Sequence, residues 1–208
     1  MDFINGILKR EELVWNKVSK NIPIVFFGCG NNAHIMKRIL ESKGLTPMVY
    51  CDNNPQVVGT TIDGIEVLSY EQVRERYQQY YMILTVAVNN AIPILGQLNQ
   101  AKEKNPIFHM EKPFKVDDEL LEYDYLESHL QEFEKVYELL EDEQSKTIFL
   151  ENINFRLSGD KIKLAKYIDG NTFFDEKLIP MSEHYSYVDV GAYTGDTLLR
   201  FYAFCGGK

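Results

Sequence analysis

Residues 24–33 read Ile-Val-Phe-Phe-Gly-Cys-Gly-Asn-Asn-Ala, and this stretch decides the fold. Residues 22–27 form a short apolar run that predicts a buried strand, and residues 32–43 predict a helix. Between them, Gly28 allows a tight turn, Gly30 lets a phosphate approach the backbone, and Ala33 lets the helix pack closely on the strand. We therefore expect the turn to hold the phosphate of a nucleotide at the helix N-terminus.

A carboxylate follows the second predicted strand, the position at which a nucleotide-binding fold of this kind has an acidic residue. Asp52 comes 22 residues after Gly30, at the end of a second predicted strand over residues 47–51. A carboxylate at this place can accept hydrogen bonds from both hydroxyls of a ribose. The alternative is a glycine turn needed only for packing and an Asp that caps a turn. The predicted nucleotide-binding residues are Gly28, Gly30, Asn31, Asn32, Asp52 and Asn53.

Strands and helices go on alternating to about residue 115. Asp63-Gly64 predicts a hairpin turn, and Ser69 with Gln72 predicts a helix start through a capping box. This alternation predicts an α/β fold with a doubly wound parallel sheet of the Rossmann-like kind. Apolar residues at helical spacing over residues 3–19 predict one amphipathic helix before it. Further strands are expected at 81–86 and 107–110, and further helices at 70–77 and 91–102.

The end of the second strand carries a further pattern. Asp52-Asn53-Asn54-Pro55 is followed by Gly59 and then by Asp63-Gly64-Ile65. Together with the glycine turn, this order resembles the N-terminal domain of sugar-nucleotide-dependent acyltransferases of the PglD type. The resemblance implies a nucleotide or nucleotide-sugar ligand for a first domain at residues 1–115.

A competing pattern follows the last predicted strand of this domain. Glu111-Lys112-Pro113 resembles the Glu-Lys-Pro of glucose-fructose-type oxidoreductases, in which the lysine assists hydride transfer. An acidic helical segment comes next, where such an enzyme would have an α/β substrate domain. An NAD(P)-dependent oxidoreductase is therefore the weakest of the functional hypotheses.

Residues 116–180 predict a helical connector. Within it, residues 117–145 hold 12 Asp and Glu residues and a single Lys. Apolar residues recur at intervals of four and three, which is the heptad spacing. This apolar stripe predicts either one long helix or two helices with a break. The stripe is expected either to pack on a neighbouring domain or to form the interface of a homodimer over residues 120–140. The stripe consists of Leu126, Leu130, Phe133, Tyr137 and Leu140.

A second glycine loop lies at residues 187–197, which read Tyr-Val-Asp-Val-Gly-Ala-Tyr-Thr-Gly-Asp-Thr. A strand over 185–190, a loop with two glycines and a helix beginning near Thr194 are expected. Asp189 can organise the loop amides, and Asp196 can cap the helix. The alternative is a structural turn without a cofactor. The predicted cofactor-binding residues are Asp189, Gly191, Ala192, Tyr193, Gly195 and Asp196.

This loop resembles motif I of S-adenosylmethionine-dependent methyltransferases, and its amino-acid sequence resembles that of the FkbM family. The resemblance implies S-adenosylmethionine as cofactor and a hydroxyl of a sugar or metabolite as methyl acceptor. Residues 181–208 are expected to be the first β-α unit of a second Rossmann-like domain, so we expect the N-terminal part of a methyltransferase that does not catalyse alone. No catalytic residue can be assigned. A non-catalytic nucleotide or nucleotide-sugar binding module is the alternative.

Composition limits the partners. The net charge is −9, with 22 Lys and Arg against 31 Asp and Glu, which argues against a nucleic-acid groove. The 208 residues contain no apolar run long enough for a membrane span, so a cytoplasmic protein with a small-molecule substrate is expected. Three cysteines without a CxxC pair predict neither a disulfide framework nor a metal site.

Overall fold

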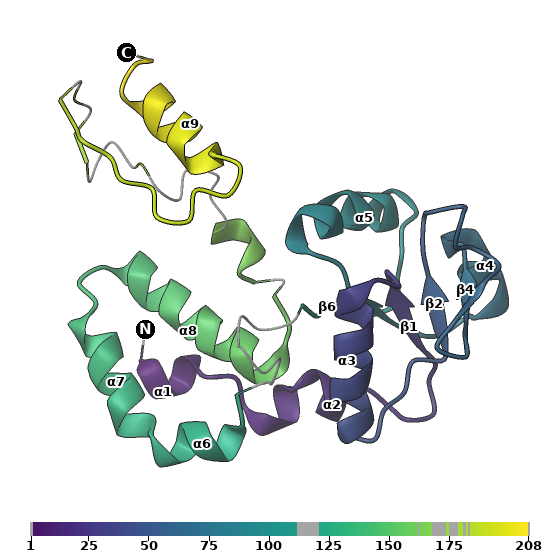
Figure 1. Ribbon diagram of the computed structural model, residues 1–208. Helices are drawn as coiled ribbons and strands as arrows, with labels where there is room; N and C mark the ends of the chain where they lie inside the picture. Colours follow the sequence, from purple (N-terminus) through teal and green to yellow (C-terminus); the bar gives the residue numbers. More distant parts are fainter. Residues whose placement is uncertain are drawn as a thin grey trace. The chain divides into compact units, whose positions relative to one another are not determined.

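A computed structural model describes residues 2–111, 121–161, 163–167, 174, 179–180, 182 and 184–207. The chain forms two compact units, Met1–Tyr167 and Ile168–Lys208. Figure 1 shows the strands and most of the helices in the first unit and a single labelled helix, α9, in the second.

Six strands among the described residues form one sheet in the order β3-β4-β2-β1-β5-β6. All neighbouring pairs are parallel except β3 and β4, which form an antiparallel hairpin. This topology confirms the predicted α/β fold with a doubly wound, Rossmann-like sheet. The strands are β1 (Ile24–Phe27), β2 (Val49–Cys51), β3 (Thr61–Ile62), β4 (Ile65–Leu68), β5 (Tyr81–Leu84) and β6 (Ile107–His109).

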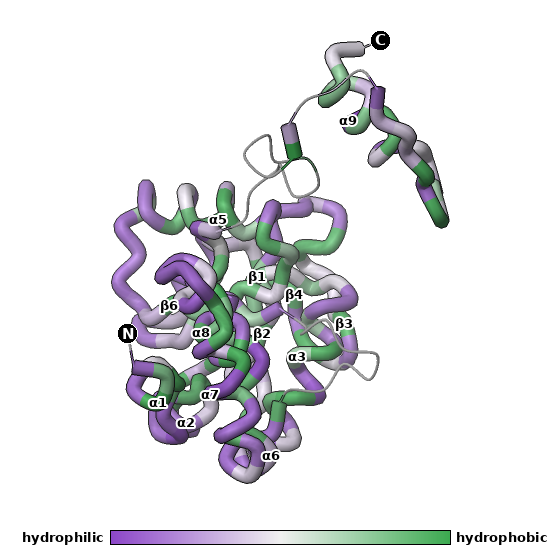
Figure 2. Tube along the Cα trace, turned by 90° about the vertical axis from the view of Figure 1, so that its left-hand side faces the viewer, coloured by the Kyte–Doolittle hydropathy of each residue, from purple (hydrophilic) through white to green (hydrophobic). Residues whose placement is uncertain are grey.

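Helices cover the two faces of the sheet in the way that its strand order requires. All four residues of β1 are buried, and the strand is hydrophobic along its length (Figure 2). Phe26 packs in the cluster that contains α3 (Asn31–Ser42), whereas Val25 and Phe27 pack with α4 (Tyr70–Arg76) and α5 (Val88–Gln100). The helices that follow β1 and β5 thus lie on opposite faces. The strand order reverses between β1 and β5, which is where ligands bind in open α/β sheets.

Local sequence signals are confirmed around the sheet. Asp63 and Gly64 have φ values of 52° and 77° and form the turn of the β3–β4 hairpin. Ser69 and Gln72 form both hydrogen bonds of a capping box at the start of α4. Gly44, with φ 75°, follows the end of α3.

The expected single helix over residues 3–19 is wrong. The segment contains α1 (Phe3–Gly6), a 3₁₀ turn (Arg10–Glu12) and α2 (Val14–Lys17). The buried side chain of Asn154 explains the interruption, because its Oδ1 accepts a hydrogen bond from the Leu8 amide (2.7 Å) and its Nδ2 donates to the Gly6 carbonyl (3.0 Å). A continuous helix would use these backbone groups itself.

The acidic segment forms helices that break at His129. These are α6 (Tyr123–Ser128) and α7 (Leu130–Leu139), followed by α8 (Glu143–Ser158). Leu126 and Tyr137 of the apolar stripe are buried in a helical core within the same chain. The stripe therefore packs inside the chain, and the homodimer stays a prediction without support from this stripe. The buried residues of this helical core are Phe3, Ile7, Leu13, Leu126, Tyr137, Leu150, Ile153 and Leu157.

A short antiparallel contact connects α8 to the sheet. Met110 and Asp160 form a β-bridge beyond β6, and the Lys161 amide donates to the His109 carbonyl (2.8 Å). The Lys161 ammonium and the Glu111 carboxylate form an ion pair at 3.0 Å, with both side chains largely buried. A 3₁₀ turn (Ala165–Tyr167) follows. The end of α8 is thereby held at the carboxyl edge of the sheet.

The second unit confirms one expected element and corrects another. The helix expected near Thr194 is α9 (Asp196–Phe204). The strand expected at 185–190 is wrong, because the described backbone there forms no strand, and Val188 and Val190 are 81% and 92% exposed. A strand needs a hydrogen-bonded neighbour, and the described part of this unit provides none. No helix in the described parts of the chain is both long enough and apolar enough to span a membrane.

Candidate functional site

The first glycine loop lies at the carboxyl edge of the sheet, between β1 and α3. Gly28 has φ 103°, and a Cβ at this position would collide with the Val86 side chain that follows β5. Thr85 supports the loop because its hydroxyl donates to the Gly28 carbonyl (2.8 Å). By contrast, a Cβ on Gly30 would meet no atom within 4 Å. Gly28 is thus required by the turn itself, whereas Gly30 leaves open space before the first turn of α3.

Asp52 lies beside this loop, as predicted. It follows β2, and its Oδ1 accepts a hydrogen bond from the Asn54 amide at 2.9 Å. Its Oδ2 accepts a hydrogen bond from the Cys29 thiol at 3.2 Å. Burial, followed by this hydrogen bond and the charge of Asp52, raises the pKa of Cys29 to about 11. The thiol is therefore kept protonated and acts as a donor to the carboxylate.

The predicted asparagines lie at the same edge, but two of them have protein partners. Asn31 is exposed at the first position of α3. The Asn32 amide donates to the Met110 carbonyl (2.9 Å) and so connects α3 to the end of β6. The Asn53 and Gln97 amides pair reciprocally at 2.8 and 3.3 Å. Asn31 is the asparagine that is best placed to contact a ligand.

Sequence reasoning missed other polar residues that end neighbouring strands. Besides Thr85 after β5, His109 ends β6, and its Nε2 lies 2.8 Å from the Val86 carbonyl oxygen. Both side chains are buried. The available signal was a polar residue directly at the end of an apolar run, since parallel strands bring their carboxyl ends to one edge. Thr85 thus contacts the glycine loop directly, and His109 contacts the backbone of Val86, the residue that lies against Gly28.

Of the Glu111-Lys112-Pro113 pattern that resembles an oxidoreductase, only Glu111 is among the described residues. Glu111 is ion-paired with Lys161 at the edge of the sheet. Lys112 and Pro113 lie outside the described residues. Among the described residues, no group of three or more His, Cys, Asp or Glu side chains could hold a metal ion.

The second glycine loop precedes α9. Gly191, Tyr193 and Gly195 all have positive φ values, of 83°, 42° and 76°. The Gly195 amide donates to the Ala192 carbonyl at 2.6 Å, which closes the loop into a compact turn. Gly195 is the N-cap of α9, so the expectation that Asp196 caps the helix is wrong, and its carboxylate instead lies in the first turn. A negative charge there complements the helix dipole.

Asp189, the acid of this loop, has an unsatisfied oxygen. Its Oδ2 is buried and has no hydrogen-bond partner among the described residues. The ring of the preceding Tyr187 stacks on Phe201 of α9 at 4.4 Å, with Phe174 against both rings. Burial and the charges of Asp189 and Asp196 raise the pKa of Tyr187. Buried carboxylate oxygens are normally hydrogen-bonded, so this atom indicates a place for a donor.

Comparisons with known proteins bear on the fold. No protein-family model matches the sequence, and no curated protein shows a significant similarity. A solved FkbM methyltransferase from Methylobacillus flagellatus KT matches with a TM-score of 0.58 and 17% identity over 89% of this chain and 53% of the methyltransferase. The chain thus spans about half the length of that protein.

Two further solved structures match less well. A UDP-D-quinovosamine 4-dehydrogenase from Vibrio fischeri has a TM-score of 0.35 at 15% identity, over 47% of this chain and 81% of its own. RSP in complex with β-NADH has a TM-score of 0.34 at 24% identity, over 58% of this chain and 64% of its own. Of the three, only the methyltransferase match is strong enough to define a shared fold. The chain therefore has the fold of an FkbM methyltransferase over most of its length.

Proposed function

We propose that the chain supplies two parts of an FkbM-type methyltransferase that acts on a hydroxyl of a sugar or metabolite. The first is the Rossmann-like sheet with its nucleotide loop, and the second is the S-adenosylmethionine loop before α9. The observation that carries the proposal is the shared methyltransferase fold over 89% of this chain. The sequence of the glycine loop in the second unit, with positive φ values at Gly191 and Gly195, supports the proposal as well.

The residues of the second loop fit the proposed cofactor. S-adenosylmethionine has a positively charged amino group, and the unpaired Oδ2 of Asp189 is an acceptor for it. Added Cβ atoms on Gly191 and Gly195 would meet no atom within 4 Å, so the loop leaves room for a ligand against its backbone. Asp189 and the backbone of Gly191, Ala192 and Tyr193 would hold the cofactor. When bound, it supplies the methyl group that is transferred.

Equilibrium dialysis of the chain against radiolabelled S-adenosylmethionine tests this role. Asp189→Asn should weaken binding at least tenfold, because an amide cannot pair with the amino group as a carboxylate does. Tyr202→Phe is the matched control in the same unit, since Tyr202 is exposed on α9 and lies outside the loop. Equal affinity of wild type and Asp189→Asn would exclude this carboxylate from the site.

A second candidate function, favoured by the open space at Gly30, is nucleotide or nucleotide-sugar binding by the first unit. A phosphate against the N-terminus of α3 would meet unpaired helix amides and the positive end of the helix dipole. Asp52, at the end of β2, would accept hydrogen bonds from the ribose hydroxyls. This function requires no chemistry in the first unit, and it is compatible with a separate methyl-transfer site.

Thermal denaturation with added ligand tests the second function. A UDP-sugar, NAD or AMP that binds the folded unit should raise its Tm. Gly30→Ala should remove the shift by filling the phosphate space. Gly96→Ala is the control, because a Cβ on Gly96 of α5 also meets no atom within 4 Å but lies away from the loop between β1 and α3. The proposal fails if none of the three ligands shifts the Tm of the wild type.

A further inference from the structure

A pocket of about 130 Å³ lies in the first unit, apart from the glycine loop. The N-terminal segment, the residue after α3 and the start of α6 form its walls. The lining combines polar and charged side chains (Arg10, Asn16, Lys43 and Glu122) with the rings of Trp15 and Tyr123 and three leucines from three segments. The leucines are Leu13, Leu121 and Leu157.

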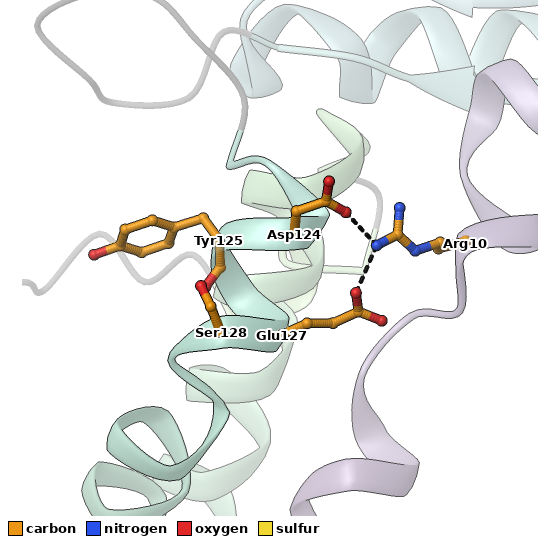
Figure 3. A network of polar contacts seen from close by, with 5 residues as sticks. All are labelled: Arg10, Asp124, Tyr125, Glu127 and Ser128. Carbon is orange, nitrogen blue, oxygen red and sulfur yellow. Dashed lines mark hydrogen bonds and ion pairs between the residues drawn. The ribbon is translucent and has the colours of Figure 1, made fainter.

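The positive charge of Arg10, which lines this pocket, is already paired with two carboxylates. Its guanidinium lies over the Tyr123 ring, 4.4 Å from the centroid, and forms ion pairs with Asp124 and with Glu127 (2.6 Å). Figure 3 shows one guanidinium nitrogen between the two carboxylates. These two hydrogen bonds raise the pKa of Arg10. Arg10 therefore fixes the wall of the pocket and has little charge left for a ligand.

Lys43 is different, because its charge is only weakly compensated. Its ammonium lies 5.4 Å from the centroid of the Trp15 ring. Within the described part of the chain its nearest carboxylate is that of Glu122, at 3.7 Å, which is longer than a hydrogen bond. The Glu122 side chain is 71% exposed, so it can turn into solvent at low cost. The ammonium is thus available to a better anionic partner.

We propose that this pocket binds a small monocarboxylate whose apolar body is the size of one six-membered ring. A cavity of about 150 Å³ accepts benzene, so the pocket volume of about 130 Å³ suits a body of one ring. A cationic ligand is disfavoured because protein cations already lie over both the Trp15 and Tyr123 rings. The ligand carboxylate would replace Glu122 as the partner of Lys43. The site is independent of the two glycine loops and of the function proposed for them.

Benzoate is the probe, and Trp15 reports its binding because it is the only tryptophan in the chain. Titration with benzoate should change the Trp15 emission in a saturable way. Lys43→Met should weaken the affinity at least tenfold by removing the ammonium, and Glu122→Gln should strengthen it severalfold by removing the competing carboxylate. Lys37→Met is the matched control, since Lys37 lies on α3 six residues before Lys43 but pairs with Glu41 at 3.0 Å and does not line the pocket. It should leave the affinity unchanged.

Benzylamine separates the proposed recognition from unspecific ring binding, because it has a similar body and the opposite charge. It should cause no saturable change. Circular dichroism confirms that each variant is folded, and the indole N–H signal of wild-type Trp15 in an NMR titration gives a second readout that needs no variant. The proposal is overturned by an absence of saturable change with benzoate, by an equal response to benzylamine, or by a folded Lys43→Met variant with wild-type affinity.

Discussion

The Cys29 thiol donates a hydrogen bond to the Asp52 carboxylate at 3.2 Å, which joins the glycine loop after β1 to the end of β2. The two residues belong to neighbouring parallel strands, since β1 pairs with β2. The carboxylate is thereby held beside the loop at which a phosphate would bind, while Oδ1 holds the Asn54 amide. The predicted diol acceptor thus has a fixed position before any ligand arrives.

Cys29 should react slowly with alkylating reagents. Its pKa of about 11 leaves little thiolate at pH 8, and thiolate is the reactive form. Asp52→Asn removes a charge that raises this pKa, so alkylation should become a few times faster, limited by the larger effect of burial. Iodoacetamide labelling followed by peptide mass spectrometry measures the rate, with the fully buried Cys51 as internal reference. An unchanged rate would show that Asp52 does not control the thiol.

The two glycines of the first loop should differ in their effect on stability. Gly28→Ala places a Cβ at positive φ and against Val86, so we expect a loss of about 2 kcal/mol or more in the free energy of unfolding. Gly30→Ala should cost less, at most about 1 kcal/mol, because φ is −84° and the space is open, and only the preference for glycine over alanine at a helix N-cap is lost. Urea unfolding measures both. Equal losses would mean that the turn does not depend on the conformation of Gly28.

Asn154 should be essential for the N-terminal segment. Asn154→Ala leaves the Leu8 amide and the Gly6 carbonyl without their side-chain partner, at a cost of about 1–3 kcal/mol. Asn152→Ala, two residues away on α8, loses only a hydrogen bond to the Ile148 carbonyl of its own helix and should cost clearly less. Chemical denaturation followed by Trp15 fluorescence compares them. Similar costs would argue against Asn154 as the cause of the helix break.

The carboxylate of Glu103 should make the free energy of unfolding depend on pH in the acid range. It accepts hydrogen bonds from the hydroxyls of Tyr70 (2.8 Å) and Tyr80 and from the amide of Asn105 (2.9 Å). Burial alone would raise its pKa, but these hydrogen bonds lower it to about 2. An unfolded Glu has a pKa of about 4.3, so the folded state gains stability above that pH and loses it as pH falls toward 2.

Glu103→Gln tests this pH dependence. At pH 7 the variant should be less stable by about 1–3 kcal/mol, because a charged acceptor is replaced by a neutral one. The difference from wild type should shrink as the pH falls from about 4.5 to about 2. Urea unfolding at several pH values gives the two curves, with the exposed Glu75→Gln on α4 as control. A constant difference across this range would contradict the depressed pKa.

The sheet and its loop could be predicted because their signals are local. The turn at Gly28 and Gly30, the hairpin at Asp63-Gly64 and the capping box at Ser69 each depend on a few neighbouring residues. The parallel order then follows from alternation of strands and helices.

The predictions that were wrong concern features that depend on residues distant in sequence. The N-terminal helix is interrupted by Asn154, which lies 146 residues from its partner Leu8. The strand expected at 185–190 requires a pairing partner that its own apolar residues, such as Val188 and Val190, do not specify. Thr85 and His109 shape the loop only because the sheet brings the ends of β5 and β6 beside it. Side-chain partners across the fold cannot be read from spacing.

The central claim is that the chain holds two separate ligand loops, one for a nucleotide and one for S-adenosylmethionine. Isothermal titration calorimetry with S-adenosylmethionine and with a UDP-sugar tests it most directly. We expect Asp189→Asn to weaken only the binding of S-adenosylmethionine, at least tenfold, and Gly30→Ala to abolish only the heat of UDP-sugar binding. Absence of binding of both ligands to the wild type, or loss of both in the same folded variant, would contradict the claim.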